Sequence, residues 1–89
     1  TKLFITNYPN PFNASTIIEF IIPSQGHLSL TIFNLQGKAI HKFRKYYASH
    51  GKYKYTWDAN NIGSGIYLIL LRHNQEISYK KVILIKYFQ

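Results

Sequence analysis

The chain has 89 residues, which suffices for one domain with a single hydrophobic core and not for two. It has no cysteine, which excludes disulfides and thiolate chemistry, and its three acidic residues argue against catalysis by paired carboxylates. The net charge of +8 attracts nucleic acid, anionic polysaccharide or acidic lipid, although lysines that protect strand edges explain the same excess.

Strand character dominates the chain. Aromatic residues make up 17% of the sequence and include eight tyrosines, and β-branched residues are frequent, a mixture that favours an all-β domain. Short apolar runs alternate with turn residues, as in a β-sandwich. The predicted strands are residues 3–6, 16–22, 27–34, 38–47, 52–58, 65–73 and 77–86.

The stretch NYPNPFN (7–13) stands between the first two predicted strands. Pro9 and Pro11 fix their own φ angles and bias the residues before them toward extended geometry. We therefore predict a stiff, polyproline-like arm instead of a full ladder strand. Tyr8 and Phe12 are expected to pin this arm across the end of the sandwich.

Period-two alternation separates the faces of the next strands. Gly37 closes a tight turn at 35–37, where glycine can take a positive φ. Lys52, Lys54 and Thr56 are expected to face water. The residues predicted to face inward are Ile18, Phe20, Ile22, Leu28, Leu30, Ile32, Ile40, Phe43, Tyr53, Tyr55 and Trp57.

The last two predicted strands are apolar on both faces. In 65–73, Ile66, Leu68 and Leu70 occupy one face and Tyr67, Ile69 and Leu71 the other, and 77–86 repeats the pattern. A thin sandwich covers only one face of each strand. Loops or a partner must therefore cover the second face.

No catalytic, metal or cofactor site is predicted. Ser64, His73 and Asp58 could form a triad on paper, but no nucleophile elbow accompanies them. The four histidines lack metal-ligand spacing, and the loop 58–65 lacks the carboxylates that calcium prefers. Asp58 is expected instead to stabilise a turn through its side chain. The domain is therefore not expected to be an enzyme.

Nucleic acid is not an expected partner, because the best stacking aromatics lie opposite the lysines of their own strand. No run of 18 apolar residues and no charged-then-apolar leader is present, so neither a membrane span nor a signal peptide is predicted. Since Thr1 stands where a methionine would begin a protein, we expect the chain to be a fragment of a longer protein.

Four segments, taken in order, resemble one family. They are YPNPFNASTIIEFIIP (8–23), LTIFNLQGKAI (30–40), GKYKYTWDANNIGSGIYLI (51–69) and KKVILIK (80–86). Together they resemble the C-terminal sorting domain of the type IX secretion system of Bacteroidetes, the type A or Por secretion system tail. The core of the resemblance covers residues 8–86 within a single domain, 1–89.

The resemblance implies an immunoglobulin-like β-sandwich of about seven antiparallel strands, preceded in its protein by a cargo domain. It implies that the domain directs this cargo through the outer-membrane translocon of the type IX system and that a sortase then removes the domain. The expected route is the periplasm in transit, followed by the outer membrane and cell surface or the extracellular medium.

Two sets of residues follow from the resemblance. The segment expected to be recognised by the translocon comprises Lys80, Lys81, Val82, Ile83, Leu84, Ile85 and Lys86. Recognition is expected through an exposed edge and an apolar second face, with addition of a strand as one mode. The family motif residues, expected to be structural, are Tyr8, Pro9, Asn10, Pro11, Phe12, Gly37, Trp57, Asp58, Gly65 and Tyr67.

An alternative function remains open from the residues. A carbohydrate-binding or adhesive immunoglobulin-like module, retained on a secreted enzyme, would hold sugar rings on surface tyrosines. The candidate tyrosines are Tyr46, Tyr47, Tyr79 and Tyr87.

Overall fold

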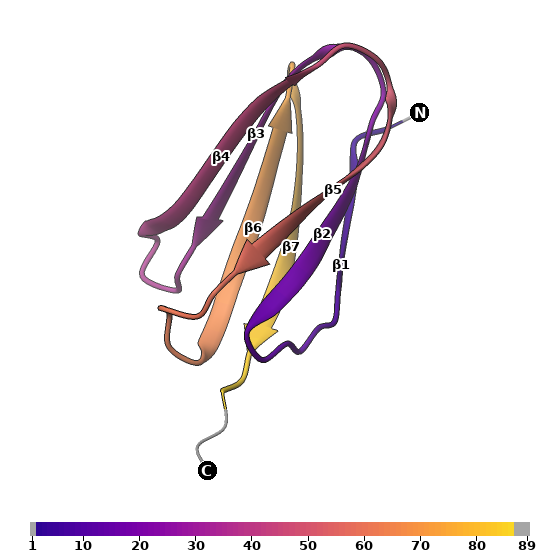
Figure 1. The fold of residues 1–89 in the computed structure, drawn as a ribbon. Helices are drawn as coiled ribbons and strands as arrows, with labels where there is room; N and C mark the ends of the chain where they lie inside the picture. Colours follow the sequence, from indigo (N-terminus) through magenta and orange to yellow (C-terminus); the bar gives the residue numbers. More distant parts are fainter. Residues whose placement is uncertain (1, 87–89) are drawn as a thin grey trace.

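The computed structural model describes residues 2–86, which form seven strands in two facing sheets (Figure 1). The strands are β1 (Phe4–Tyr8), β2 (Ser15–Ile22), β3 (Gly26–Phe33), β4 (Ala39–Tyr47), β5 (Gly51–Asp58), β6 (Gly65–His73) and β7 (Glu76–Leu84).

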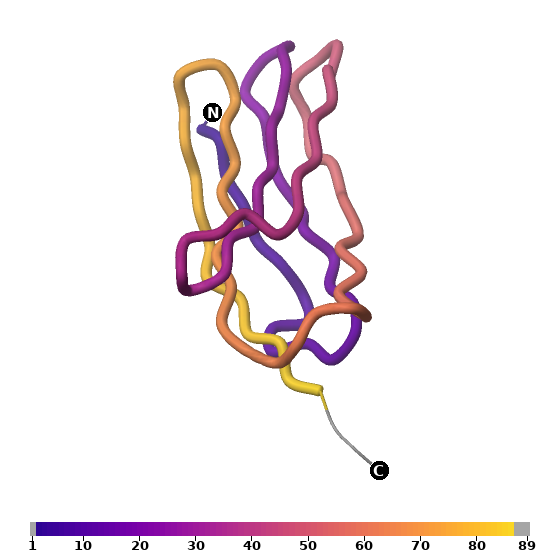
Figure 2. The backbone as a smooth tube through the Cα atoms, turned by 90° about the vertical axis from the view of Figure 1, so that its left-hand side faces the viewer, coloured from indigo at the N-terminus to yellow at the C-terminus, as the bar shows by residue number. Residues whose placement is uncertain are grey.

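One sheet has the strand order β1-β2-β5 and the other β4-β3-β6-β7, and every neighbouring pair is antiparallel. The predicted fold, a sandwich of seven antiparallel strands, is confirmed. The molecule is elongated, with principal extents of 45 × 23 × 17 Å. The N-terminal end of the described chain and its C-terminal end lie at opposite ends of the long axis (Figures 1 and 2).

The core lies between the two sheets and follows the predicted alternation. Side chains from β1, β2 and β5 of one sheet meet side chains from β3, β6 and β7 of the other, and burying each aliphatic one contributes about 1.5–3 kcal/mol. Among the described residues, those with no exposed surface are Ile18, Phe20, Ile22, Leu28, Leu30, Ile32, Trp57, Ala59, Ile69, Leu71 and Val82, together with the polar His73.

The side of the sandwich between β4 and β5 is closed by aromatic rings. Tyr53 and Tyr55, predicted to face the core, are only half-buried there, because β5 and β4 are the edge strands of their sheets. The ring of Tyr55 stacks on Phe43 with centroids 4.2 Å apart. Ile40 and Phe43 are likewise partly buried and packed against the core, in agreement with their predicted direction.

The prediction of an arm outside the ladder is wrong for the first part of NYPNPFN. Asn7 and Tyr8 belong to β1 and pair with Ile18 and Ile17 of β2. Tyr8 is 43% exposed and does not pin the segment, whereas Phe12 is 3% exposed, as predicted.

Residues 2–86 contain no helix of the length and hydropathy that crossing a bilayer requires. The turn at 35–37 does contain the predicted left-handed glycine, since Gly37 has a φ of 84°. The loop at 34–38 lies beside β6, and Figure 2 shows it projecting in front of the β6–β7 pair.

Candidate recognition surface

The closing segment, predicted to be the recognition site, divides between core and surface. β7 is an edge strand whose alternation turns Val82 and Leu84 inward, where they are almost completely buried. Lys81 and Ile85 are exposed on the other side, with Ile83 half-buried between them. Lys86 is fixed beyond the strand, where its ammonium donates to the carbonyl of Asn60 at 2.6 Å.

The free edge of β7 is engaged by the chain itself near its C-terminal end. The amide of Phe12 donates to the carbonyl of Ile83 at 2.9 Å, and the amide of Ile85 donates to the carbonyl of Phe12 at 2.8 Å. Asn10 adds two bonds, accepting from the amide of Ile83 at 3.0 Å and donating to the carbonyl of Lys81 at 3.3 Å. Adding a foreign strand at residues 81–85 would require breaking these four bonds.

The segment that makes these bonds carries the YPNPF motif. The Tyr8–Pro9 and Asn10–Pro11 peptide bonds are both cis. The carbonyl of Pro9 accepts a hydrogen bond from the Thr16 hydroxyl at 2.8 Å. Phe12 packs against Trp57 with ring centroids 5.3 Å apart. The motif therefore joins β1 and β2 to the closing strand of the other sheet.

Two further motif residues shape the same end of the sandwich. Tyr67 packs edge-on against Trp57, and its hydroxyl donates to the carbonyl of Gly63 at 2.6 Å. This bond from a tyrosine near the start of a strand to backbone just upstream is the tyrosine corner of immunoglobulin-like sandwiches. Asp58 accepts from the amide of Asn60 at 3.0 Å, which is the predicted turn. A Cβ at Gly65 would meet the Tyr67 ring at 3.7 Å, so packing does not require glycine there.

The structure does not bring Ser64, His73 and Asp58 together as a catalytic triad. Ser64 precedes β6, whereas His73 ends it, nine residues on, so about 30 Å of strand separates them. His73 is also completely buried. Over the described range 2–86, no three His, Asp or Glu side chains come together as ligands of a metal ion would.

The surface tyrosines do not form one platform for a sugar. Tyr47 is 7% exposed and packs against Tyr53 with centroids 4.2 Å apart, so it is not available for stacking. Burial, with the neighbouring Tyr53, raises the pKa of the Tyr47 hydroxyl above its ordinary value. Tyr46 and Tyr79 are exposed, but β3 and β6 lie between their strands. Tyr87 lies outside the described residues.

The outer face of the four-stranded sheet carries most of the exposed large apolar side chains, whereas Phe4 and Tyr8 are exposed on β1 of the other sheet. The pattern predicted for the last two strands holds, and loops leave much of their second face open. The large apolar residues of β6 and β7 that are exposed on this face are Ile66, Leu68, Ile77 and Tyr79, followed by Ile85 after the strand.

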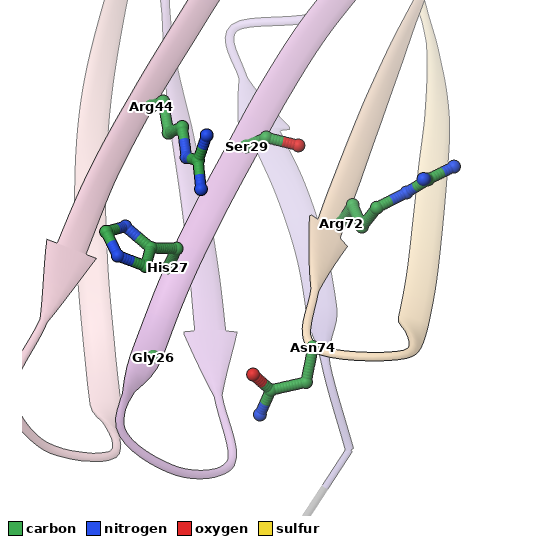
Figure 3. A pocket seen from close by; sticks show the side chains of 6 residues that line it. All are labelled: Gly26, His27, Ser29, Arg44, Arg72 and Asn74. Carbon is green, nitrogen blue, oxygen red and sulfur yellow. The ribbon is translucent and has the colours of Figure 1, made fainter.

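Cations flank these apolar side chains. Register aligns Lys42 with Thr31 and Leu70, and aligns Arg44 with Ser29 and Arg72. Arg44, Ser29 and Arg72 line an open hollow of about 450 Å³ (Figure 3). In the close-up, Arg44 turns toward β3 while Arg72 extends away from the hollow toward β7.

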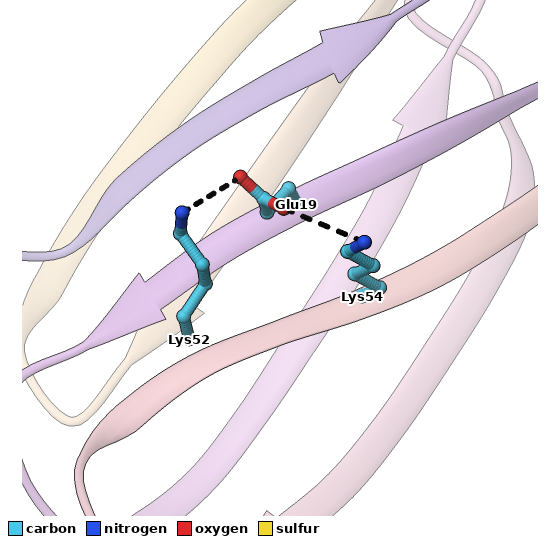
Figure 4. Close-up of polar contacts among 3 residues, drawn as sticks. All are labelled: Glu19, Lys52 and Lys54. Carbon is cyan, nitrogen blue, oxygen red and sulfur yellow. Dashed lines mark ion pairs between the residues drawn. The ribbon is translucent and has the colours of Figure 1, made fainter.

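The outer face of the three-stranded sheet differs in its charge pairing. Glu19 lies between Lys52 and Lys54 there, with nitrogen–oxygen distances of 3.4 and 4.0 Å (Figure 4). These two lysines are the predicted solvated face. In the described part of the chain, no ion pair involves the cations of the other sheet's outer face.

Together these features define a β-sandwich interaction domain. The edge of its last strand is hydrogen-bonded along residues 81–85, and the outer face of its four-stranded sheet exposes apolar side chains. The sequence matches the family model described as the secretion system C-terminal sorting domain over residues 6–86, and the chain belongs to that family. It is thus a non-catalytic sorting domain of the Por, or type IX, secretion system, which directs the secretion of a cargo protein. The predicted resemblance and function are confirmed.

One solved structure has a similar fold. The crystal structure of dimeric latent PorU from Porphyromonas gingivalis matches with a TM-score of 0.72 and 17% sequence identity. The match covers 93% of this chain and 9% of the PorU chain, and at this identity it shows the fold alone. No curated protein matches the sequence closely enough to count as a relative.

Proposed function

We propose that residues 1–89 form the single C-terminal address domain of a longer protein, and that the outer-membrane translocon reads this domain in its folded state through residues 80–86. The supporting observation is that buried and outward-facing side chains alternate within this segment. Val82 and Leu84 anchor the strand in the core, while Lys81, Ile83 and Ile85 face outward. Folding thus presents the outward residues in a fixed order and spacing.

The proposed route has the cargo and domain pass through the periplasm together. The translocon then exports them across the outer membrane, and a sortase removes the domain, leaving the cargo at the cell surface or in the medium. The family supports secretion by this system, and the translocon, the sortase and the final compartment belong to the proposal.

The test is export of a fluorescent reporter joined to Thr1, in a type IX host, with an added signal peptide. Deleting residues 80–86 would remove two core side chains, so substitutions are preferable. The variant Lys81→Gln with Ile85→Ser should retain its urea midpoint and lose at least about tenfold of surface export, which corresponds to about 1.4 kcal/mol of recognition.

The matched control changes the other sheet. Lys54→Gln with Ile17→Ser alters one lysine and one isoleucine of the outer face of β2 and β5. Control export should equal that of the unaltered domain. Undiminished export of the Lys81→Gln, Ile85→Ser variant would contradict recognition through the closing segment.

A further inference from the structure

The outer face of β3, β6 and β7 presents apolar side chains in adjoining register positions. Ile66 lies opposite Ile83, Leu68 lies between Phe33 and Lys81, and Leu70 lies beside Tyr79. Ile66 and Leu68 are 38% and 37% exposed. Because side chains on one face of neighbouring strands lie about 5 Å apart, these residues form one continuous apolar strip.

The strip is hollowed at one end. The turn after β3 brings Leu35 and Gly37 beside β6, and with Phe33, Ile66 and Leu68 they line a hollow of about 340 Å³ with Lys81 at its rim. Leu35 is 71% exposed, although it sits at the wall of an apolar hollow. Such a concave apolar site accommodates a protruding apolar side chain.

The charge around the strip has one sign. Lys81 stands at the hollow, Arg72 and Arg44 lie farther along the same face, and Lys42 lies in the row between. The acids lie elsewhere. Glu19 is on the other sheet, Asp58 ends β5, and Glu76 lies at the β6–β7 turn, where its carboxylate accepts from the amide of Leu3 at 3.2 Å.

We propose that this face, defined by Phe33, Leu35, Ile66, Leu68, Leu70 and Lys81 with its flanking arginines, docks an acidic protein surface that inserts an apolar side chain into the hollow. Complementary charge steers such partners together and selects against others. A second copy of this domain is disfavoured, because two such faces would oppose cation to cation. A lipid surface is disfavoured, because a bilayer presents no protruding side chain that would fill the hollow of about 340 Å³.

The inference rests on the proposed function, since it names the chemistry of the partner that reads the domain. It also changes the expected mode of recognition by the partner. The backbone edge at 81–85 is already bonded to Asn10 and Phe12 of the loop between β1 and β2, whereas the side chains on this face are exposed to solvent. Recognition therefore occurs on the face of the sheet and not by addition of a strand at that edge.

Photo-crosslinking in the exporting host tests the proposal. A photoreactive amino acid replaces Leu68 in the reporter fusion, and another replaces Thr56 on the opposite sheet as the matched control. We expect a protein adduct from position 68 only. Introducing Lys81→Glu with Arg72→Glu should reduce this adduct at least about tenfold while leaving the urea midpoint unchanged.

The remaining outcomes overturn the proposal. Equal adducts from positions 68 and 56, or an adduct that survives charge reversal, would mean that this face is not selected. Binding of the purified domain to vesicles of anionic phospholipid, lost on Leu68→Ser, would assign the face to a membrane. Normal export without an adduct at position 68 would overturn this inference alone, whereas absence of export by the unaltered fusion would overturn the proposed function.

Discussion

Asn10 and Ile83 are joined across the two sheets, with the side-chain oxygen of Asn10 accepting a hydrogen bond from the amide of Ile83 at 3.0 Å. The same side chain donates to the carbonyl of Lys81 at 3.3 Å. The side-chain amide of Asn10 thereby makes the pair of hydrogen bonds to β7 that the backbone of a neighbouring strand would make. These two hydrogen bonds support the structural role that the resemblance implies for Asn10.

We expect Asn10→Ala to lower the free energy of unfolding by about 1–2 kcal/mol, because two hydrogen bonds are lost and each contributes about 0.5–1.5 kcal/mol. Urea denaturation followed by tryptophan fluorescence measures the change. The control, Asn61→Ala, alters an exposed loop side chain and should leave the midpoint within error. Equal midpoints for both variants would show that the Asn10 bonds add no stability.

Removal of one oxygen atom tests the tyrosine corner. Tyr67→Phe keeps the ring against Trp57 and deletes the donor to the Gly63 carbonyl. The expected loss is about 1–1.5 kcal/mol in the free energy of unfolding, measured by chemical denaturation. Tyr79→Phe makes the same chemical change at a side chain that is 69% exposed and should have no effect. A loss of equal size in both variants would contradict the assignment.

The buried histidine offers a gain in stability. His73 has no exposed surface, and neither ring nitrogen has a hydrogen-bond partner among the described residues. Since an unsatisfied buried polar group costs about 1–3 kcal/mol, His73→Leu should raise the free energy of unfolding by about 1–2 kcal/mol. Thermal denaturation of this variant, beside His27→Leu at an exposed position, measures the gain. A lower melting temperature for His73→Leu would show that its ring is satisfied or needed for packing.

Alkaline pH should destabilise the domain through Tyr47. Burial raises the pKa of its hydroxyl above the ordinary value of 10.0. A group whose pKa is raised by folding makes its full contribution to the free energy of unfolding below its unfolded pKa. This contribution is lost as the pH rises through the folded pKa. The urea midpoint should therefore fall above pH 10.

Comparison with Tyr47→Phe isolates the contribution of Tyr47 from other effects of alkaline pH. The fall in the midpoint between pH 9 and pH 11 should be smaller in Tyr47→Phe than in the unaltered domain. Tyr46→Phe, at a half-exposed position on the same strand, should fall as the unaltered domain does. Identical pH profiles for all three proteins would contradict the prediction.

Local alternation predicted much of this fold. The seven strands lie within a few residues of their predicted limits, and Trp57 is fully buried as the pattern of β5 requires. The two-faced character of β6 was likewise readable, because period two assigns each side chain to a face. The exposed apolar face could therefore be predicted, although its occupant could not.

Contacts between distant segments escaped prediction. The prolines indicated stiffness, but nothing local reveals that Asn10 bonds to Ile83, 73 positions later. The burial of Tyr47 and the half-exposure of Tyr55 depend on how the edges of the two sheets meet, which the alternation within one strand does not specify. The sequence likewise does not show that Asn10 and Phe12 occupy the edge of β7 at residues 81–85, so recognition by strand addition at this edge is a reasonable prediction from the sequence alone.

The hydrogen bonds of Asn10 and Phe12 to residues 81–85 make the loop between β1 and β2 dependent on the last strand. Residues 10–12 are synthesised well before β7, so a chain that stops before Lys81 leaves Asn10 and Phe12 without their partners there. Such a chain also lacks Val82 and Leu84 from the core. The loop between β1 and β2 and the core thus both depend on the last strand, so we expect truncation within β7 to destabilise the whole domain and not only its end.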